Sequence, residues 1–166
     1  MTNKETKMTE RAADFVKYLE SSLVKEDCEK HGVIFLEDAK LRANEGEAEI
    51  PVGTYTKLEK LPDGEKIVIR GSTSMKEVIM EAAASYAKLY NVKADDLFDV
   101  ELKGSSKGTK AVKEDTKGNT IGLSSAAVKD EKVRSFNICY DAVAVIVNKK
   151  NTLVENLTLK QLFEIY

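Results

Sequence analysis

The sequence has few of the residues that build nucleic-acid, metal or catalytic sites. Its 166 residues include no Trp, and aromatic residues make up 7%, so platforms on which bases could stack are not expected. A net charge of −2 gives no electrostatic footprint for nucleic acid or for an acidic membrane surface. The single histidine, His31, is expected near a helix C-terminus and has no visible catalytic partner. We therefore expect no nucleic-acid partner and no cofactor.

Cysteine is also scarce, and the two that occur do not have the spacing of a metal site. Cys139 lies in an apolar segment, where a buried free thiol is expected. Cys28 lies in a charged helical stretch, which is compatible with an exposed side chain. A disulfide between them is the alternative that their spacing leaves open.

Long hydrophobic runs are absent as well. No stretch approaches the length of a membrane-spanning helix, and the polar start lacks the apolar region of a signal peptide. We expect residues 1–8 to be a disordered N-terminal tail. The chain is then either cytoplasmic or a fragment without its export signal. With 42% apolar residues it has the composition of one soluble globular domain.

The first part of the chain predicts a helix followed by a weakly patterned connector. Residues 9–30 have apolar positions at the spacing of a buried helical face, including Leu23. A short strand is expected at 33–36. Residues 37–64 hold both prolines, and we interpret them as a connector with a short strand or hairpin at 49–58, outside the core.

The second part alternates strands with helices and predicts an α/β fold. The expected strands are 66–70, 98–102 and 120–123, with an apolar strand region at 133–147 broken near 140–141. The expected helices are 74–90, 108–114 and 158–166. The last opens with Thr158 and Gln161 in a capping-box pattern and reaches the last residue without a C-cap, which suggests a truncated chain. Alternation of this kind predicts a mixed, mostly parallel sheet flanked by helices.

Hydroxyl side chains follow three of these strands at the point where each strand ends. The turns are Gly71-Ser72-Thr73-Ser74, Gly104-Ser105-Ser106 and Ser124-Ser125. Carboxyl ends of parallel strands line one crevice, and helix N-termini there favour anions. The sequence therefore predicts an oxyanion site. The plain alternative is that Ser72 or Thr73 only caps the following helix.

Four motifs in one order give a resemblance to a known family. They are Gly71-Ser-Thr-Ser, Gly104-Ser-Ser-Lys-Gly-Thr-Lys-Ala-Val112, Ile121-Gly-Leu-Ser-Ser125, and Tyr140-Asp-Ala-Val-Ala-Val-Ile-Val-Asn148 followed by Asn156-Leu-Thr-Leu-Lys-Gln-Leu-Phe163. This order resembles the first lobe of the phosphate-binding proteins that serve ABC-type phosphate importers. The resemblance implies a three-layer lobe of a type II substrate-binding protein over residues 65–166. In that family two lobes close on a dehydrated phosphate.

The resemblance also implies site residues. Thr73 and Ser74 match the first phosphate-contacting turn, and Ser105 matches the second. Ser125 falls where many members have an aspartate that accepts the proton of hydrogen phosphate, and Asp141 is the nearest candidate for a replacement acid. The alternative for Asp141 is a strand-end carboxylate bonded to the backbone. The full expected set is Ser72, Thr73, Ser74, Ser105, Ser106, Ser124, Ser125 and Asp141.

The resemblance implies a second lobe, which we expect to be missing from this chain. Residues 9–36 look similar to the family's returning C-terminal segment, which suggests a tandem protein or a circular permutant. The resemblance thus implies a half-site for inorganic phosphate and permease subunits as partners. It also implies a parent lipoprotein at the extracellular face of the membrane or in the periplasm. The sequence does not decide whether two copies of the chain form a homodimer that covers the exposed cleft face. The alternative is a non-catalytic sensory or interaction domain that lost the ligand. An enzyme is not expected, because no base stands at triad-like spacing from the serines.

Overall fold

A central sheet of three parallel strands forms the middle layer of the protein. The computed structural model describes residues 1–35, 41–43, 46–48, 53–141, 146, 148–152 and 156–165. In the sheet, β5 (Ile67–Gly71) lies between β6 (Phe98–Glu101) and β7 (Thr120–Leu123). Ile69 of β5 stands opposite Val100 on one side and Ile121 on the other. The three strands predicted at these positions are thereby confirmed.

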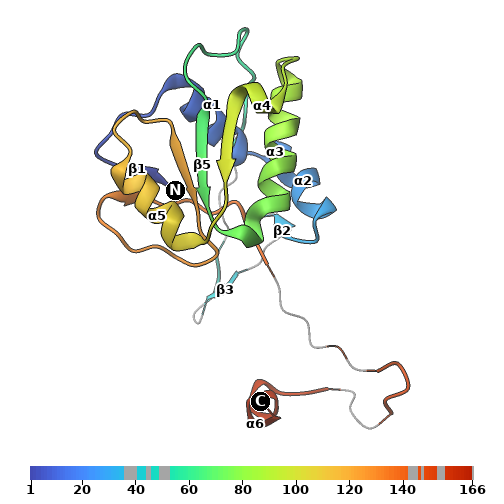
Figure 1. Cartoon of the computed structure of the whole chain (residues 1–166). Coiled ribbons are helices and arrows are strands. Elements are labelled where there is room, and N and C mark those ends of the chain that lie inside the picture. Colours follow the sequence, from blue (N-terminus) through green and yellow to red (C-terminus); the bar gives the residue numbers. More distant parts are fainter. Residues whose placement is uncertain are drawn as a thin grey trace.

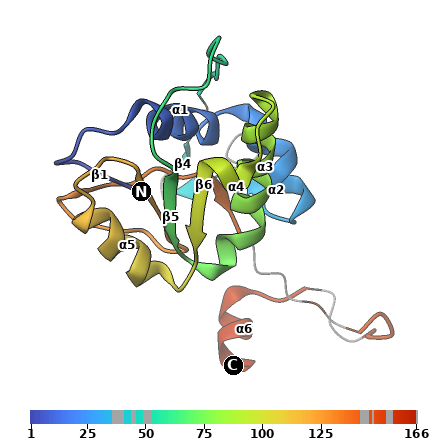
Figure 2. The same ribbon diagram turned by 45° about the horizontal axis from the view of Figure 1, so that its top comes forward.

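Helices cover both faces of this sheet, as Figures 1 and 2 show. The helices α3 (Lys76–Leu89) and α4 (Ala94–Leu97) connect β5 to β6, and α5 (Ser105–Glu114) connects β6 to β7. These two crossovers run in opposite directions across the sheet. Because such crossovers are right-handed, α3 and α5 lie on opposite faces. The three-layer α/β lobe expected from the sequence is the observed fold.

The N-terminal helices pack on the α3 side and complete the core. They are α1 (Glu10–Leu19), the 3-10 helix η1 (Ser22–Val24) and α2 (Lys25–Lys30), followed by β2 (Ile34–Phe35). Phe15 of α1 is fully buried, with its ring centroid 5.0 Å from that of Tyr86 in α3 and 4.7 Å from that of Phe98 in β6. The N-terminal helices therefore share one hydrophobic core with α3 and the central sheet.

The predicted continuous helix at 9–30 is interrupted. The Ser21 hydroxyl donates to the Tyr18 carbonyl at 2.7 Å and accepts from the Leu23 N–H at 3.4 Å. A buried serine that bonds its neighbouring backbone offers an alternative to the helical ladder, so the chain breaks there. Leu23 turns outward and is 49% exposed, contrary to the prediction.

The first residues are not the disordered tail that we expected. Strand β1 (Thr2–Asn3) pairs antiparallel with β8 (Val133–Arg134), and Met1 is only 7% exposed. The Asn3 side chain donates to the Asp115 carbonyl at 3.1 Å. Met1 also packs with Val112 and Val133, but the backbone pairing and polar bonds of Thr2 and Asn3 leave no hydrophobic pattern in the sequence.

The connector and the end of the chain differ from expectation in detail. Strands β3 (Leu41–Ala43) and β4 (Gly46–Ala48) form an antiparallel hairpin earlier than the one predicted at 49–58, of which residues 49–52 lie outside the described residues. Within the predicted strand region 133–147, β8 is followed by β9 (Cys139–Tyr140), which pairs with β2. Residues 142–145 and 147 lie outside the described residues.

The last helix has the predicted capping box. In α6 (Leu159–Ile165) the Thr158 N–H donates to Gln161 Oε1 at 2.9 Å, and the Gln161 N–H donates to Thr158 Oγ1 at 3.2 Å. No helix in the described part of the chain is both long and apolar enough to cross a membrane.

Candidate functional site

The three hydroxyl turns meet at one edge of the sheet, the lower edge in Figure 1. Parallel pairing aligns the strand ends, with Gly71 opposite Leu123. Backbone bonds then join the turns, because the Gly104 N–H donates to the Gly71 carbonyl at 2.8 Å and the Ser72 N–H donates to the Leu123 carbonyl at 3.0 Å. The structure therefore brings together the three segments that the sequence pattern singled out.

Glycines allow α5 to approach the strand ends closely. Gly71 has a φ of 136°, and a Cβ on it would lie 2.1 Å from the Leu123 carbonyl oxygen. A Cβ on Gly108 of α5 would lie 2.8 Å from both the Arg70 carbonyl oxygen and the Gly71 Cα. The backbones of α5 and β5 thus touch without an intervening side chain. As a result, the beginning of α5 stands beside the turn that follows β5.

Two helix beginnings at this edge have no side-chain cap. After β5 comes the 3-10 helix η3 (Thr73–Met75), with Ser72 at its N-cap, and α5 begins after Gly104. Neither position makes a side-chain capping bond. Ser72 is 4% exposed, and its hydroxyl contacts the Ser74 hydroxyl at 2.8 Å. The first N–H groups of a helix have no intrahelical partner, and the N-terminal dipole end of α5 favours an anion.

Ser105 links the second and third turns. Its Oγ accepts a hydrogen bond from the Ser125 N–H at 3.3 Å and lies 3.4 Å from the Ser125 Oγ. Ser124 is engaged within its own turn, since its hydroxyl donates to the Ala126 carbonyl at 2.7 Å and accepts from the Ala126 N–H at 3.2 Å. Of the two serines in the third turn, Ser125 is therefore the one that faces the second turn.

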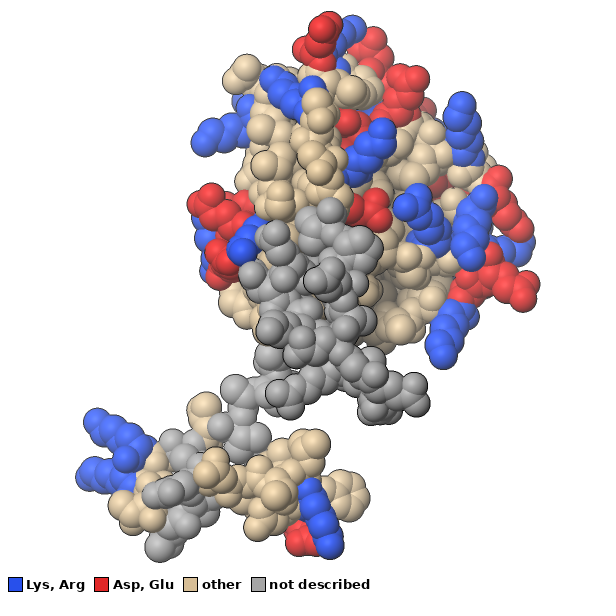
Figure 3. Space-filling view, turned by 180° about the vertical axis from the view of Figure 1, so that it is seen from behind, with Lys and Arg blue, Asp and Glu red and all other residues tan. Residues whose placement is uncertain are grey.

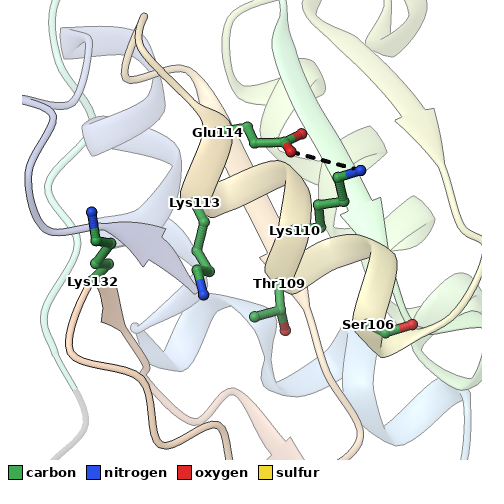
Figure 4. A pocket seen from close by; sticks show the side chains of 6 residues that line it. All are labelled: Ser106, Thr109, Lys110, Lys113, Glu114 and Lys132. Atoms are coloured by element: carbon green, nitrogen blue, oxygen red, sulfur yellow. Dashed lines mark ion pairs between the residues drawn. The ribbon is translucent and has the colours of Figure 1, made fainter.

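Two residues of the predicted set lie less centrally. Asp141 is exposed and follows β9, which pairs with β2 and not with the three-stranded sheet. Its role as a replacement acid stays a prediction. Ser106 is exposed in the first turn of α5 and lines a separate hollow on the outer side of that helix (Figure 4).

This hollow encloses about 670 Å³ along α5, and Figure 4 shows three lysines around it. Each lysine has an acidic partner: Lys110 lies 3.7 Å from Glu114, Lys113 lies 2.8 Å from Asp130, and Lys132 lies 3.1 Å from Glu5. Since these carboxylates compensate the positive charges, the hollow is a weaker anion site than the strand-end turns. We take the turns as the candidate site.

Two basic side chains beside the turns are also paired with carboxylates. Arg70 at the end of β5 bonds Asp99 at 2.6 Å, and Lys103 lies 2.5 Å from Glu101. The hydrogen bond from Lys103, together with the charge of Arg70, holds the pKa of Glu101 below its usual range. On the face seen in Figure 3, basic and acidic side chains are interspersed among the described residues. An anion held at the turns would therefore gain little from Arg70 or Lys103.

The sequence pattern missed one part of this site. Helix α5 begins at Ser105, three residues before the predicted start at Gly108, so Ser105 and Ser106 belong to its first turn. Gly104 could have indicated this earlier start of α5, because a glycine followed by two serines is typical of a helix N-terminus. The described residues contain no cluster of three or more His, Cys, Asp or Glu side chains that could hold a metal.

The turns therefore lie at the carboxyl ends of the strands, which is where open α/β sheets bind their ligands. A family model described as a PBP superfamily domain matches residues 48–166, and the chain belongs to that superfamily.

Two phosphate-binding proteins are similar to this chain over its whole length. The chain is 30% identical over 170 aligned residues to the phosphate-binding protein PstS 2 of Streptococcus agalactiae serotype V (strain ATCC BAA-611 / 2603 V/R), and equally to PstS 2 of serotype III (strain NEM316). Each alignment covers 100% of this chain and 50% of the relative, so the chain spans about half the length of the curated relatives it matches.

A solved structure shares the fold. The phosphate-binding protein of a phosphate ABC transporter from Streptococcus pneumoniae TIGR4 superposes with a TM-score of 0.52 at 20% identity. The match covers 79% of this chain and 42% of that one.

Proposed function

We propose that this chain binds inorganic phosphate, or a similar tetrahedral oxyanion, without catalysis, as part of the solute-binding component of an ABC transporter. The observation that carries the proposal is the meeting of three hydroxyl turns with two uncapped helix beginnings at one sheet edge. Both PstS 2 relatives are named phosphate-binding proteins. By the same reasoning, the protein delivers its ligand to permease subunits. It does so at the extracellular face of the membrane or in the periplasm.

The ligand would lie between the first and second turns. The hydroxyls of Thr73, Ser74 and Ser105 supply donors, and the N–H groups at the start of α5 add to them. Ser125 offers a hydroxyl where a proton-accepting carboxylate is expected from the resemblance. Without that carboxylate, rejection of fully ionised sulfate should be weak unless Asp141 replaces it.

We infer that these residues supply one wall of a cleft, and we therefore expect the affinity to be low. A single wall leaves the anion partly hydrated and supplies only part of the donors. We expect a Kd of about 1 mM or weaker for this chain. Micromolar binding in calorimetry would contradict the half-site.

A phosphate titration followed by amide chemical shifts tests the proposal. Wild-type protein should show shifts at the three turns, and the double variant Thr73→Ala/Ser105→Ala should lose them. Lys110→Ala is the matched control, because Lys110 lines the hollow along α5 and not the turns. If only Lys110→Ala lost the phosphate-induced shifts, phosphate would bind in the hollow and not at the turns. An unchanged titration in the double variant would show that these hydroxyls do not hold the phosphate. Absence of shifts at the turns in the wild-type protein would instead favour a sensory or interaction domain that no longer binds the ligand.

A further inference from the structure

The first turn of α5 carries an exposed basic residue, Lys107, which is the third residue of the helix. Arg70 and Lys103, the two basic side chains beside the turns, are already paired with Asp99 and Glu101. Among the residues that the structure describes, no carboxylate forms an ion pair with Lys107. Its positive charge is therefore available to an anion that binds at the turns.

The position of Lys107 is unfavourable for the helix when no anion is bound. The N-terminal end of a helix carries a partial positive charge, so acidic residues stabilise this end and basic residues destabilise it. The first turn of α5 contains no acidic residue that could offset the charge of Lys107. Local choices that oppose a physical rule in this way occur in proteins mostly at functional sites. A bound anion would compensate both the helix end and the lysine.

The backbone at the start of α5 offers hydrogen-bond donors beside this charge. The Gly104 carbonyl accepts the N–H groups of Lys107 at 3.1 Å and of Gly108 at 3.4 Å. The amides left without an acceptor inside the helix are those of Ser105 and Ser106. Helical side chains lean toward the N-terminus, so a long side chain at Lys107 covers the turn that holds these two serines. The ammonium, the two amides and the Ser105 hydroxyl can thus meet one anion.

We propose that the Lys107 ammonium forms an ion pair with the oxyanion held at the turns. The inference rests on the proposed function, because it assigns a further binding residue to the same site. An ammonium is a compact point charge on a flexible stem, so it contributes charge and not shape. Lys107 therefore favours doubly charged tetrahedral oxyanions, and it does not distinguish phosphate from sulfate.

Titration of the wild-type chain and of Lys107→Gln with inorganic phosphate, followed by amide chemical shifts, tests the proposal. At low ionic strength Lys107→Gln should raise the Kd about fivefold, and the difference should shrink at about 1 M salt, where charges are screened. Lys107→Arg keeps the charge and should bind like the wild type. The matched control is Lys110→Gln on the outer side of the same helix, where Glu114 lies 3.7 Å away, and it should also bind like the wild type.

Thermal unfolding supplies a second readout, which a merely structural lysine would not give. Lysine and glutamine have similar helix propensities, so Lys107→Gln removes the charge and changes little else. In a buffer without phosphate or sulfate, Lys107→Gln should therefore raise the Tm by about 1–3 °C at low salt. Added phosphate should then stabilise the wild type more than Lys107→Gln, because the wild type binds it more tightly.

The outcomes separate this inference from the proposed function. If phosphate shifts the turns of the wild type and Lys107→Gln has the same Kd, the inference is wrong and the proposed function stands. Equal weakening in Lys110→Gln would also overturn the inference, since the charge would then act without regard to its position. So would a lower Tm of Lys107→Gln without phosphate. If the wild type shows no shifts at the turns, the proposed function fails and the inference fails with it.

Discussion

Replacing Gly108 by alanine tests the close contact between α5 and β5. In an exposed helix interior, glycine to alanine stabilises by about 1 kcal/mol, because alanine has the higher helix propensity. Gly108 is buried, and a Cβ there would lie 2.8 Å from the Arg70 carbonyl oxygen and 2.9 Å from the Leu123 carbonyl oxygen. These atoms belong to backbone and cannot rotate away. The helix must therefore move outward.

The geometry sets the expected magnitude. Overpacking of a well-packed site costs typically 1–3 kcal/mol, and contact with the backbone of two strands places Gly108→Ala toward the upper end, about 3 kcal/mol. Subtracting the propensity gain of about 1 kcal/mol leaves a net loss of about 2 kcal/mol. For a domain of this size the loss corresponds to a fall in Tm of roughly 4–8 °C.

Urea unfolding and thermal melting followed by circular dichroism measure this loss. Lys110→Ala, an exposed substitution two residues away in the same helix, should change the unfolding free energy by less than about 0.5 kcal/mol. Because Gly108 brings the start of α5 to the turns, Gly108→Ala should also weaken the phosphate-induced shifts at Ser105. A variant stabilised by about 1 kcal/mol, as in an ordinary exposed helix, would refute the contact.

Two further predictions concern the buried carboxylate of Asp14 and its tyrosines. Asp14 Oδ2 accepts hydrogen bonds from Tyr86 at 2.7 Å and from Tyr55 and Tyr90 at 2.9 Å. Asp14→Asn should lower the unfolding free energy measured in urea by about 2–3 kcal/mol, because hydrogen bonds to a buried charge are lost. The control Glu10→Gln, on the same helix, should lower it by less than about 1 kcal/mol. Equal effects of the two variants would contradict the role of Asp14. Burial and the bond to Asp14 raise the pKa of Tyr86 above its ordinary 10.0. With rising pH the tyrosine ionises in the unfolded chain before it ionises in the folded one, so the unfolding free energy should fall above about pH 10. The expected slope is about 1.4 kcal/mol per pH unit for each such tyrosine. A flat profile of the unfolding free energy between about pH 9 and about pH 11 would contradict this.

Regular elements with strong apolar patterns could be predicted from the sequence. The strand predicted at 120–123 is β7 with the same bounds, and the helix predicted at 74–90 is α3 preceded by η3. In these segments burial of side chains follows the periodicity, so local pattern and tertiary packing agree. The three hydroxyl turns could be grouped because parallel pairing places strand ends together.

Features held by the backbone or by polar side chains could not be predicted. Strand β1 has only polar residues, and its burial depends on pairing with a segment far along the chain. Asp14 interrupts an apolar helix face, and nothing in its neighbourhood indicates that three tyrosines converge on it. Cys28 is buried in the core cluster against which Cys139 packs, and the place of Cys139 likewise depends on the pairing of β2 with β9. Partners distant in sequence leave no local pattern.

The measurement that tests the central claim most directly is the titration of the wild-type chain with inorganic phosphate, followed residue by residue through amide chemical shifts. We predict saturable shifts concentrated at Ser72–Ser74, Ser105 and Ser125, with a Kd of about 1 mM or weaker. Shifts confined to Lys113 and Lys132 in the hollow along α5, or none at the turns at phosphate concentrations well above 1 mM, would contradict the phosphate half-site.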